Sequence, residues 1–420
     1  MAARRDHVLR TNANLRWSFL GNLTSNLGSA ISTLAFPLLV LSLGGNAVQA
    51  GSVATVSLVT RLGFRLPAGG LVDRWNRRVV MLVADLVRCA ALASVPLAAL
   101  WVAPRYWQLL LVAVVEGLAS ALFGPANSVL IRDVVDQEQL SQALGADQAA
   151  LNVVSLAGPA LGGLLFTAGR LVPFAVDAAS YALSALLILR ITARPAAVSG
   201  PRAAAERGAT AGLRWLAAQR ELLVVLLYAA VVNLVAAAID VVVILELRGR
   251  GSSGGVIGAV VACIGAGGII GALLAPWLVR RLTIPAMVLT IGAVWSAELV
   301  VFAVAFRPAV VAPLLGLMML LSPAAGVAVF QALLGQTPRH LVGRVSAATS
   351  LLLSGLAAVG PMAAGAAYQA LGGSRTWLTL ALLSGVATVG CRLALSATRS
   401  RAAVVVAEPA VLAHAQGDDS

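Results

Sequence analysis

Ionisable side chains are rare in this chain, and the few that interrupt its apolar stretches are the residues best suited to chemistry. Only 11% of the 420 residues are charged, whereas 60% are hydrophobic. Glu116, Asp240 and Arg61 each lie inside a long apolar run. A carboxyl group in an apolar cavity can take up and release a proton near neutral pH. Glu116 and Asp240 are therefore candidates for carrying a proton or attracting a cationic ligand.

Each of these residues also has a structural interpretation. Charged groups inside a membrane usually pair with one another or line a cavity. Glu116 could therefore form an ion pair with Arg61, and Asp240 could reach water near the end of its run. Asp85 and Arg88 are spaced i, i+3, so we expect them to pair along one helix.

Polar amides form a second set of candidate binding groups. Asn22 and Asn26 are spaced i, i+4 on one helix face, and Asn233 lies in a later apolar run. These amides could contact a substrate or hydrogen-bond neighbouring helices. No histidine lies in an apolar run, and no phosphate-binding loop of the Walker form is present. We therefore expect a protein that is not an enzyme and that uses no cofactor and no metal.

The elements that hold these residues are predicted to be membrane-spanning helices. The mean hydropathy of the chain is +0.91. A helix needs about 20 apolar residues to cross a bilayer, and runs of that size recur twelve times between residues 17 and 396. A β-barrel would show short alternating segments instead. The sequence thus predicts an all-α polytopic membrane protein with twelve transmembrane helices.

The runs divide into two groups of six around an Arg-, Ala- and Pro-rich segment. The expected organisation is a cytoplasmic N-terminus at 1–16, an N-terminal six-helix half at 17–192, a cytoplasmic linker at 193–221, a C-terminal six-helix half at 222–396 and a cytoplasmic tail at 397–420.

The two halves resemble each other at a single offset of 202 residues. Glycine, serine, tryptophan and arginine positions of the second to fifth runs recur in the eighth to eleventh runs. One matched pair is Gly158-Pro159 with Gly360-Pro361, and proline inside a helix permits a bend. Parallel repeats of this kind predict two pseudo-symmetric halves with a substrate site between them, near mid-membrane.

The distribution of arginine predicts orientation. The net charge is +13, which would also suit a nucleic-acid partner. The arginines, however, gather in alternate loops, as the positive-inside rule requires. This pattern predicts a multi-pass protein of a bacterial cell (inner) membrane with both termini in the cytoplasm and with lipid, not nucleic acid, around it.

A ten-residue motif joins the second and third runs. It reads Gly69-Gly70-Leu71-Val72-Asp73-Arg74-Trp75-Asn76-Arg77-Arg78. It resembles the loop signature of the major facilitator superfamily, although Asn76 stands where glycine is usual. Asparagine also tolerates a left-handed turn. Segments 123–126, 158–163, 177–181 and 342–346 further resemble the drug-efflux branch that contains macrolide-efflux proteins and the enterobactin exporter.

The resemblance implies a major facilitator fold in which the first, fourth, seventh and tenth spans line a central cavity. Glu116 and Asp240 would lie on two of these spans. It implies a monomeric secondary transporter that exports small lipophilic or amphiphilic compounds (drugs, antibiotics or secondary metabolites) in exchange for protons, by alternating access. An uptake symporter, a siderophore exporter and a non-transporting membrane partner of the same fold are the alternatives.

The resemblance also implies that the loop motif latches the two halves when the transporter faces outward. The residues assigned to this latch are Gly69, Asp73, Arg74, Arg77 and Arg78. An ordinary solvated turn with weak surface ion pairs is the alternative.

Overall fold

The computed structural model describes residues 12–192, 209–338 and 341–415, and these residues form helices joined by short turns, with no strand among them. Ten helical stretches within these ranges are long and apolar enough to cross a membrane. A shorter apolar helix of 17 residues and a 28-residue helix that carries Arg61 and Arg65 complete the predicted set of twelve.

The N-terminal half contains six helices, and the first three of them begin at asparagine caps. Asn12, Asn46 and Asn76 each accept a hydrogen bond from a backbone N–H of the first helical turn, which satisfies a donor that has no partner inside the helix. The helices are α2 (Ala13–Ser42), α3 (Ala47–Arg74), α4 (Arg77–Ala98), α5 (Tyr106–Val134), α6 (Gln137–Ala168) and α7 (Val172–Ile188).

The C-terminal half repeats this order, with its fourth span broken into two helices. A turn after Met318 and Pro323 in the first turn of the next helix separate the two pieces. The helices are α9 (Arg220–Gly249), α10 (Gly254–Arg281), α11 (Ile284–Val304), α12 (Pro308–Met318), α13 (Ser322–Gln336), α14 (Val342–Leu371) and α15 (Gly373–Ala415).

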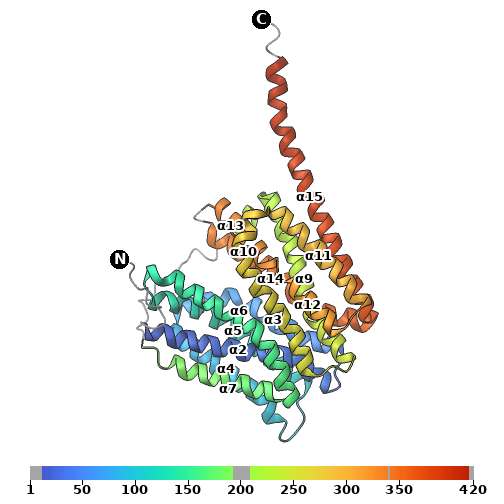
Figure 1. Ribbon diagram of the computed structural model, residues 1–420. Coiled ribbons are helices and arrows are strands. Elements are labelled where there is room, and N and C mark those ends of the chain that lie inside the picture. Colours follow the sequence, from blue (N-terminus) through green and yellow to red (C-terminus); the bar gives the residue numbers. More distant parts are fainter. Residues whose placement is uncertain (1–11, 193–208, 339–340, 416–420) are drawn as a thin grey trace, which may run out of the picture.

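Two helices extend beyond the predicted boundaries. The segment expected as a linker contains α8 (Ala209–Ala218), whose Leu216 is buried against Leu333 and Val345 of the C-terminal half. The last helix, α15, continues to Ala415 and projects away from the bundle, past the boundary expected at residue 396 (Figure 1).

The same helix pairs pack together in both halves. In the N-terminal half, α2 packs on α6 and α7, and α5 packs on α3 and α4. In the C-terminal half, α9 packs on α14 and α15, and α10 packs on α12 and α13. The two halves are therefore built as pseudo-symmetric copies.

The helix bounds correct the single offset of 202 residues. Helices α3 and α10 have equal lengths and are 207 residues apart, whereas Gly158-Pro159 and Gly360-Pro361 are 202 apart. The two registers differ because the loop between α4 and α5 is longer than the loop between α11 and α12. The matches that the sequence suggested between α3 and α10 are therefore out of register.

The two halves touch through α3 with α14 and through α6 with α10. Gly51 lies against the carbonyl of Pro361, and its counterpart Gly258 lies against the carbonyl of Pro159. A Cβ at either glycine would overlap the facing carbonyl oxygen, so glycine is needed for this approach. Both contacts lie toward the end of the bundle where α2 ends and α3 begins. We call this end the far end. We call the opposite end, where α7 stops and α9 starts, the linker end.

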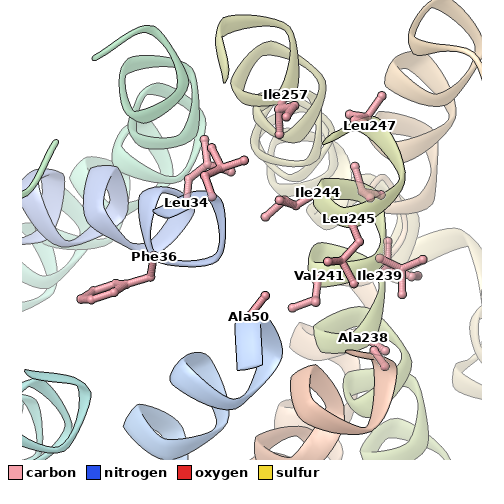
Figure 2. Packing of buried hydrophobic residues seen from close by; sticks show 14 of the residues in the cluster. Leu34, Phe36, Ala50, Ala238, Ile239, Val241, Ile244, Leu245, Leu247 and Ile257 are labelled. Atoms are coloured by element: carbon pink, nitrogen blue, oxygen red, sulfur yellow. The ribbon is translucent and has the colours of Figure 1, made fainter. Parts of the chain in front are cut away.

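Hydrophobic packing shows the same difference between the far end and the linker end. Among the described residues, the largest buried cluster takes members from both halves, and all the smaller clusters are confined to one half. Figure 2 shows Leu34 and Ala50 of the N-terminal half beside Val241 and Ile244 of α9, in the far-end part of these helices. The halves thus pack together at the far end and diverge toward the linker end (Figure 1).

Candidate functional site

A cluster of charged side chains is buried inside the N-terminal half, and Arg88 of α4 lies at its centre. Arg88 is 4% exposed, and its Nη1 lies 3.7 Å from Oδ1 of Asp85, one helical turn earlier. Its guanidinium also sits over the rings of Phe123 and Tyr181, at 5.1 and 5.2 Å from their centroids. The pairing of Asp85 with Arg88 expected from the sequence is confirmed.

Glu116 of α5 belongs to this cluster. The Tyr181 hydroxyl of α7 donates a hydrogen bond of 3.0 Å to Oε2 of Glu116. The Ser29 hydroxyl of α2 lies 2.8 Å from that same Tyr181 oxygen. Glu116 is therefore linked through Tyr181 to α2 and lies within the electrostatic reach of Arg88. Arg61, the partner that the sequence suggested, is exposed on α3 instead.

Asp177 of α7 is the third carboxyl of the cluster and is fully buried. Ser180 donates to its Oδ1 at 3.3 Å, and Gly28 of α2 lies directly against both side chains. In the sequence, Asp177 and Tyr181 stood out only as part of segment 177–181, which resembles the drug-efflux branch, and neither was a candidate site residue. The available signal was their spacing, since Asp177, Ser180 and Tyr181 share one helix face at i, i+3 and i+4.

The close approach of α2 to Asp177 gives a stability prediction. A Cβ at Gly28 would overlap Ser180 Oγ and Asp177 Oδ1. We expect Gly28→Ala to destabilise the protein by about 1–3 kcal/mol, because overpacking forces buried side chains to shift. Thermal unfolding in detergent measures the change. Gly63→Ala is the matched control, since nothing lies within 4 Å of a Cβ at Gly63. Equal melting temperatures for both variants would refute the tight fit.

The charges of the cluster do not balance. Three carboxyl groups, those of Asp85, Glu116 and Asp177, surround the guanidinium of Arg88, and the second arginine nearby, Arg61, acts on Arg88 by repulsion. Both oxygens of Asp85 and one oxygen each of Glu116 and Asp177 have no hydrogen-bond partner among the described residues. Burying a carboxylate without partners is costly, and a proton removes most of that cost. The carboxyl groups of the cluster can thus bind and release protons while they stay buried.

The equivalent position in the C-terminal half is apolar. With the two registers found above, Arg88 corresponds to Trp295 and Glu116 corresponds to Met318. Trp295 Nε1 donates to the Met318 carbonyl at 2.7 Å, so a neutral contact joins the same pair of helices. The fold therefore does not require charged groups at the positions of Arg88 and Glu116. Glu298, one turn from Trp295, is buried, and neither of its oxygens has a hydrogen-bond partner within the described ranges.

The candidate amides differ in their surroundings. Asn22 donates to Oδ1 of Asp147 on α6 at 2.7 Å, and Asn26 donates to Oδ1 of Asn22 at 2.7 Å. These two amides thus join α2 to α6. Asn233 is exposed on α9. Asp240 is also exposed and borders a cavity of about 100 Å³ between α9, α10 and α12.

The arginines of the loop motif contact their own half. Arg77 Nε lies 3.8 Å from Oδ2 of Asp133 at the end of α5. Arg78 donates to the carbonyls of Ile188 and Leu189 at the end of α7, where a cation also suits the helix dipole. Arg74 is exposed, and a Cβ at Gly69 would meet nothing within 4 Å. The side chain of Asp73 lies outside the described part of the structure.

The Gly-Pro elements lie where helices cross closely. Gly158 packs against Ala30 of α2, and Gly360 packs against the Leu234 carbonyl of α9. Pro159 and Pro361 present their carbonyls to the opposite half, and α6 and α14 continue helically through them. Among the described residues, no group of His, Cys, Asp and Glu side chains could hold a metal ion.

Comparison with known proteins decides the family. The profile of the Major Facilitator Superfamily matches residues 18–361. The chain belongs to this superfamily. The multidrug efflux pump Tap of Mycobacterium bovis BCG is 31% identical over 400 residues, which cover 88% of this chain and 91% of the pump. Macrolide efflux protein A of Streptococcus pyogenes is 28% identical over 130 residues, 29% of this chain and 32% of that protein.

Solved transporter structures share the fold of this chain over most of their length. A bacterial homologue of the human lysosomal transporter Spinster, in an inward-facing and unoccupied conformation, gives a TM-score of 0.73 at 15% identity and covers 91% of this chain and 96% of its own. An inward-facing bacterial homologue of the iron transporter ferroportin gives 0.68 at 16% identity, with coverages of 90% and 98%. The resemblance to the superfamily's drug-efflux branch and the all-helical, two-half fold are thus confirmed.

Proposed function

We propose that this protein exports small lipophilic or amphiphilic compounds across a bacterial cell membrane in exchange for protons. The similarity to a multidrug efflux pump over most of both chains supports export of such compounds. The observation that carries the proton coupling is the buried cluster around Arg88. It brings three buried carboxyl groups around Arg88, and the positions equivalent to Arg88 and Glu116 in the C-terminal half are Trp295 and Met318, which carry no charge.

Glu116 is the group that exchanges the proton in this proposal. As a residue it is less enclosed than Asp85 and Asp177, although its Oε1 atom is buried, and its Oε2 accepts the hydrogen bond that links it to α7 and α2. Arg88 supplies a permanent positive charge that stabilises the ionised cluster. The Tyr181 hydroxyl connects Glu116 to Ser29 on α2, so a change in the charge of Glu116 acts on a helix that packs on both α6 and α7.

Transport proceeds by alternating access of the two halves, which rock about the glycine contacts at Gly51 and Gly258. The arginine distribution supports placing the termini and the linker end in the cytoplasm. The far-end packing then corresponds to a state closed to the outside. In the outward-facing state, Asp73 and Arg77 would latch the two halves at the linker end. Arg77 already contacts Asp133 there in the state described here.

Everted membrane vesicles test the function directly. With the lumen acidified, we expect a labelled macrolide or lipophilic cation to accumulate in the lumen while protons leave it. The readouts are the trapped label and a lumenal pH dye, against vesicles without the protein. Loss of preloaded label from an acid lumen together with protons would indicate an uptake symporter. Movement of a siderophore alone would indicate the siderophore exporter. No movement of any compound and no proton flux would support a non-transporting protein.

A further inference from the structure

Two arginines on the second span of the N-terminal half have no acid to balance them. Arg61 and Arg65 of α3 are both exposed, and neither forms an ion pair with any of the described residues. The charged groups that act on Arg61 are Arg65 and Arg88, and both repel it. Charged side chains at membrane depth are costly and usually have a partner. This pair therefore lacks the negative charge that would stabilise it.

The face of α3 that carries Arg61 determines what the side chain faces. Ala50 lies eleven residues before Arg61, which is about three helical turns, so the two residues share one face. Ala50 is fully buried in the cluster that joins the two halves, and it lies beside Val241 of α9 (Figure 2). Because the halves diverge toward the linker end, the same face is uncovered at Arg61. Arg61 thus lies between the two halves and not toward lipid.

Arg65, one turn further along α3, also lies between the halves. Its Nη1 donates to Ser350 Oγ of α14 at 2.7 Å. A neutral hydroxyl accepts this bond, so the charge of Arg65 is still uncompensated. Apolar groups border the pair, since a Cβ at Gly355 of α14 would lie 3.8 Å from the Leu62 side chain. The pair thus joins two cationic groups to an apolar surface to which both halves contribute.

The fold does not require these two charges. With the register of 207 residues, Arg61 corresponds to Gly268 and Arg65 corresponds to Ala272 on α10. Helix α10 packs on α6 across the halves as α3 packs on α14, yet it carries no charge at either position. The two arginines are therefore a feature of the N-terminal half alone, and packing does not account for them.

Two guanidinium groups at this spacing favour one class of ligand. Side chains at i, i+4 are neighbours on a helix, with Cβ atoms about 5–6 Å apart. A carboxylate, sulfonate or phosphate group can accept hydrogen bonds from both guanidinium groups, and such charge-assisted bonds are about twice as strong as neutral ones. The apolar part of the same molecule gains contact with the apolar surface beside the pair. Neutral compounds and cations gain nothing from the two charges.

We propose that Arg61 and Arg65 bind the acid group of amphiphilic anions between the two halves. This rests on the proposed function, because it adds acidic compounds to the substrates of such an exporter. The acid group supplies the negative charge that the described residues do not provide. Loss of either arginine charge then weakens binding of an acid and leaves binding of its uncharged analogue unchanged.

Equilibrium dialysis of the purified full-length protein in a neutral detergent, against micelles without protein, tests this without any need for transport. Pyrenebutanoate and pyrenebutanamide are the probes, because they have nearly the same shape and differ in charge. We expect Arg61→Gln and Arg65→Gln each to raise the Kd of pyrenebutanoate about tenfold or more, which corresponds to about 1.4 kcal/mol or more. Both variants should bind the amide as the native protein does. Arg61→Lys keeps the charge and should retain most of the affinity for the acid.

Arg105→Gln is the matched control, because Arg105 is an exposed arginine of the same half at the far end. An unchanged Kd for the acid in either glutamine variant of α3, or an equal loss in Arg105→Gln, would overturn the paired site. A parallel loss of acid and amide would also overturn it, since that result reports a damaged protein and not a missing charge. If acid binding depends on both arginines but vesicles export no compound, the site stands and the proposed export fails. If vesicles export a macrolide with coupled proton flux while the α3 variants bind the acid normally, export stands and this site fails.

Discussion

Glu116→Gln is expected to abolish substrate-driven proton movement in everted vesicles, reducing it to the level of vesicles without the protein. Glutamine has nearly the same shape and can still accept the hydrogen bond from Tyr181. It cannot ionise, so the cluster loses the group that exchanges the proton. The melting temperature in detergent should stay close to native, because the replacement keeps the size of the side chain and its hydrogen bond with Tyr181. A lumenal pH dye and thermal unfolding provide the two measurements.

Glu298→Gln is the informative comparison, because Glu298 is also a buried acid and lies in the C-terminal half. Proton movement should persist in that variant. If Glu298→Gln abolished it and Glu116→Gln did not, proton exchange would belong to the C-terminal half. Native proton release in both variants, at normal protein levels, would exclude both carboxyl groups as coupling sites and leave Asp240 as the next candidate.

Gly258→Leu is expected to lower the transport rate at least about tenfold by separating α10 from α6 at the far end. A side chain at Gly258 has no space, because its Cβ would overlap the Pro159 carbonyl oxygen and crowd Gly163. Backbone carbonyls of two packed helices cannot move aside as a flexible side chain can. The far-end packing would therefore open. The state that is closed at the far end would lose stability relative to the state that is open there, and the transport cycle would slow.

A reporter cysteine distinguishes opening of the far end from general misfolding. Ala50 is fully buried there, so Ala50→Cys in a background without Cys89, Cys263 and Cys391 should react slowly with an impermeant maleimide. Adding Gly258→Leu should speed labelling from the far-end side. Gly268→Leu on the same helix is the control, since nothing lies within 4 Å of a Cβ there. The idea fails if the two leucine variants label and transport alike.

Much of the fold could be predicted because long, apolar runs of sequence indicate membrane-spanning helices. The sequence also placed Glu116 deep in its span and paired Asp85 with Arg88, since both are properties of a single helix. Asp177 and Tyr181 were missed because their importance comes from contacts across helices. Only the packing of α7 on α2 and α4 brings them to Arg88 and Glu116.

The repeat illustrates the same limit. Identity of glycines favoured one offset of 202 residues, but loops can change length without disturbing the helices they join. The shorter loop after α11 shifts the register of the first three helices of each half to 207. The helix bounds, together with the contacts of Gly51 and Gly258 with their facing prolines, reveal which positions are equivalent. The comparison of Arg88 with Trp295 depends on that correction.

The position of α8 has a consequence for how the protein is made. During synthesis this ten-residue helix precedes α9, yet the cluster that buries Leu216 is completed by Leu333, Val345 and Ala348 of α13 and α14, which are synthesised much later. A helix of this length is marginal alone in water. The packing of α8 is therefore completed only after α14 has been inserted. A truncation before residue 342 would remove Val345 and Ala348 from the cluster and leave part of the apolar face of α8 uncovered.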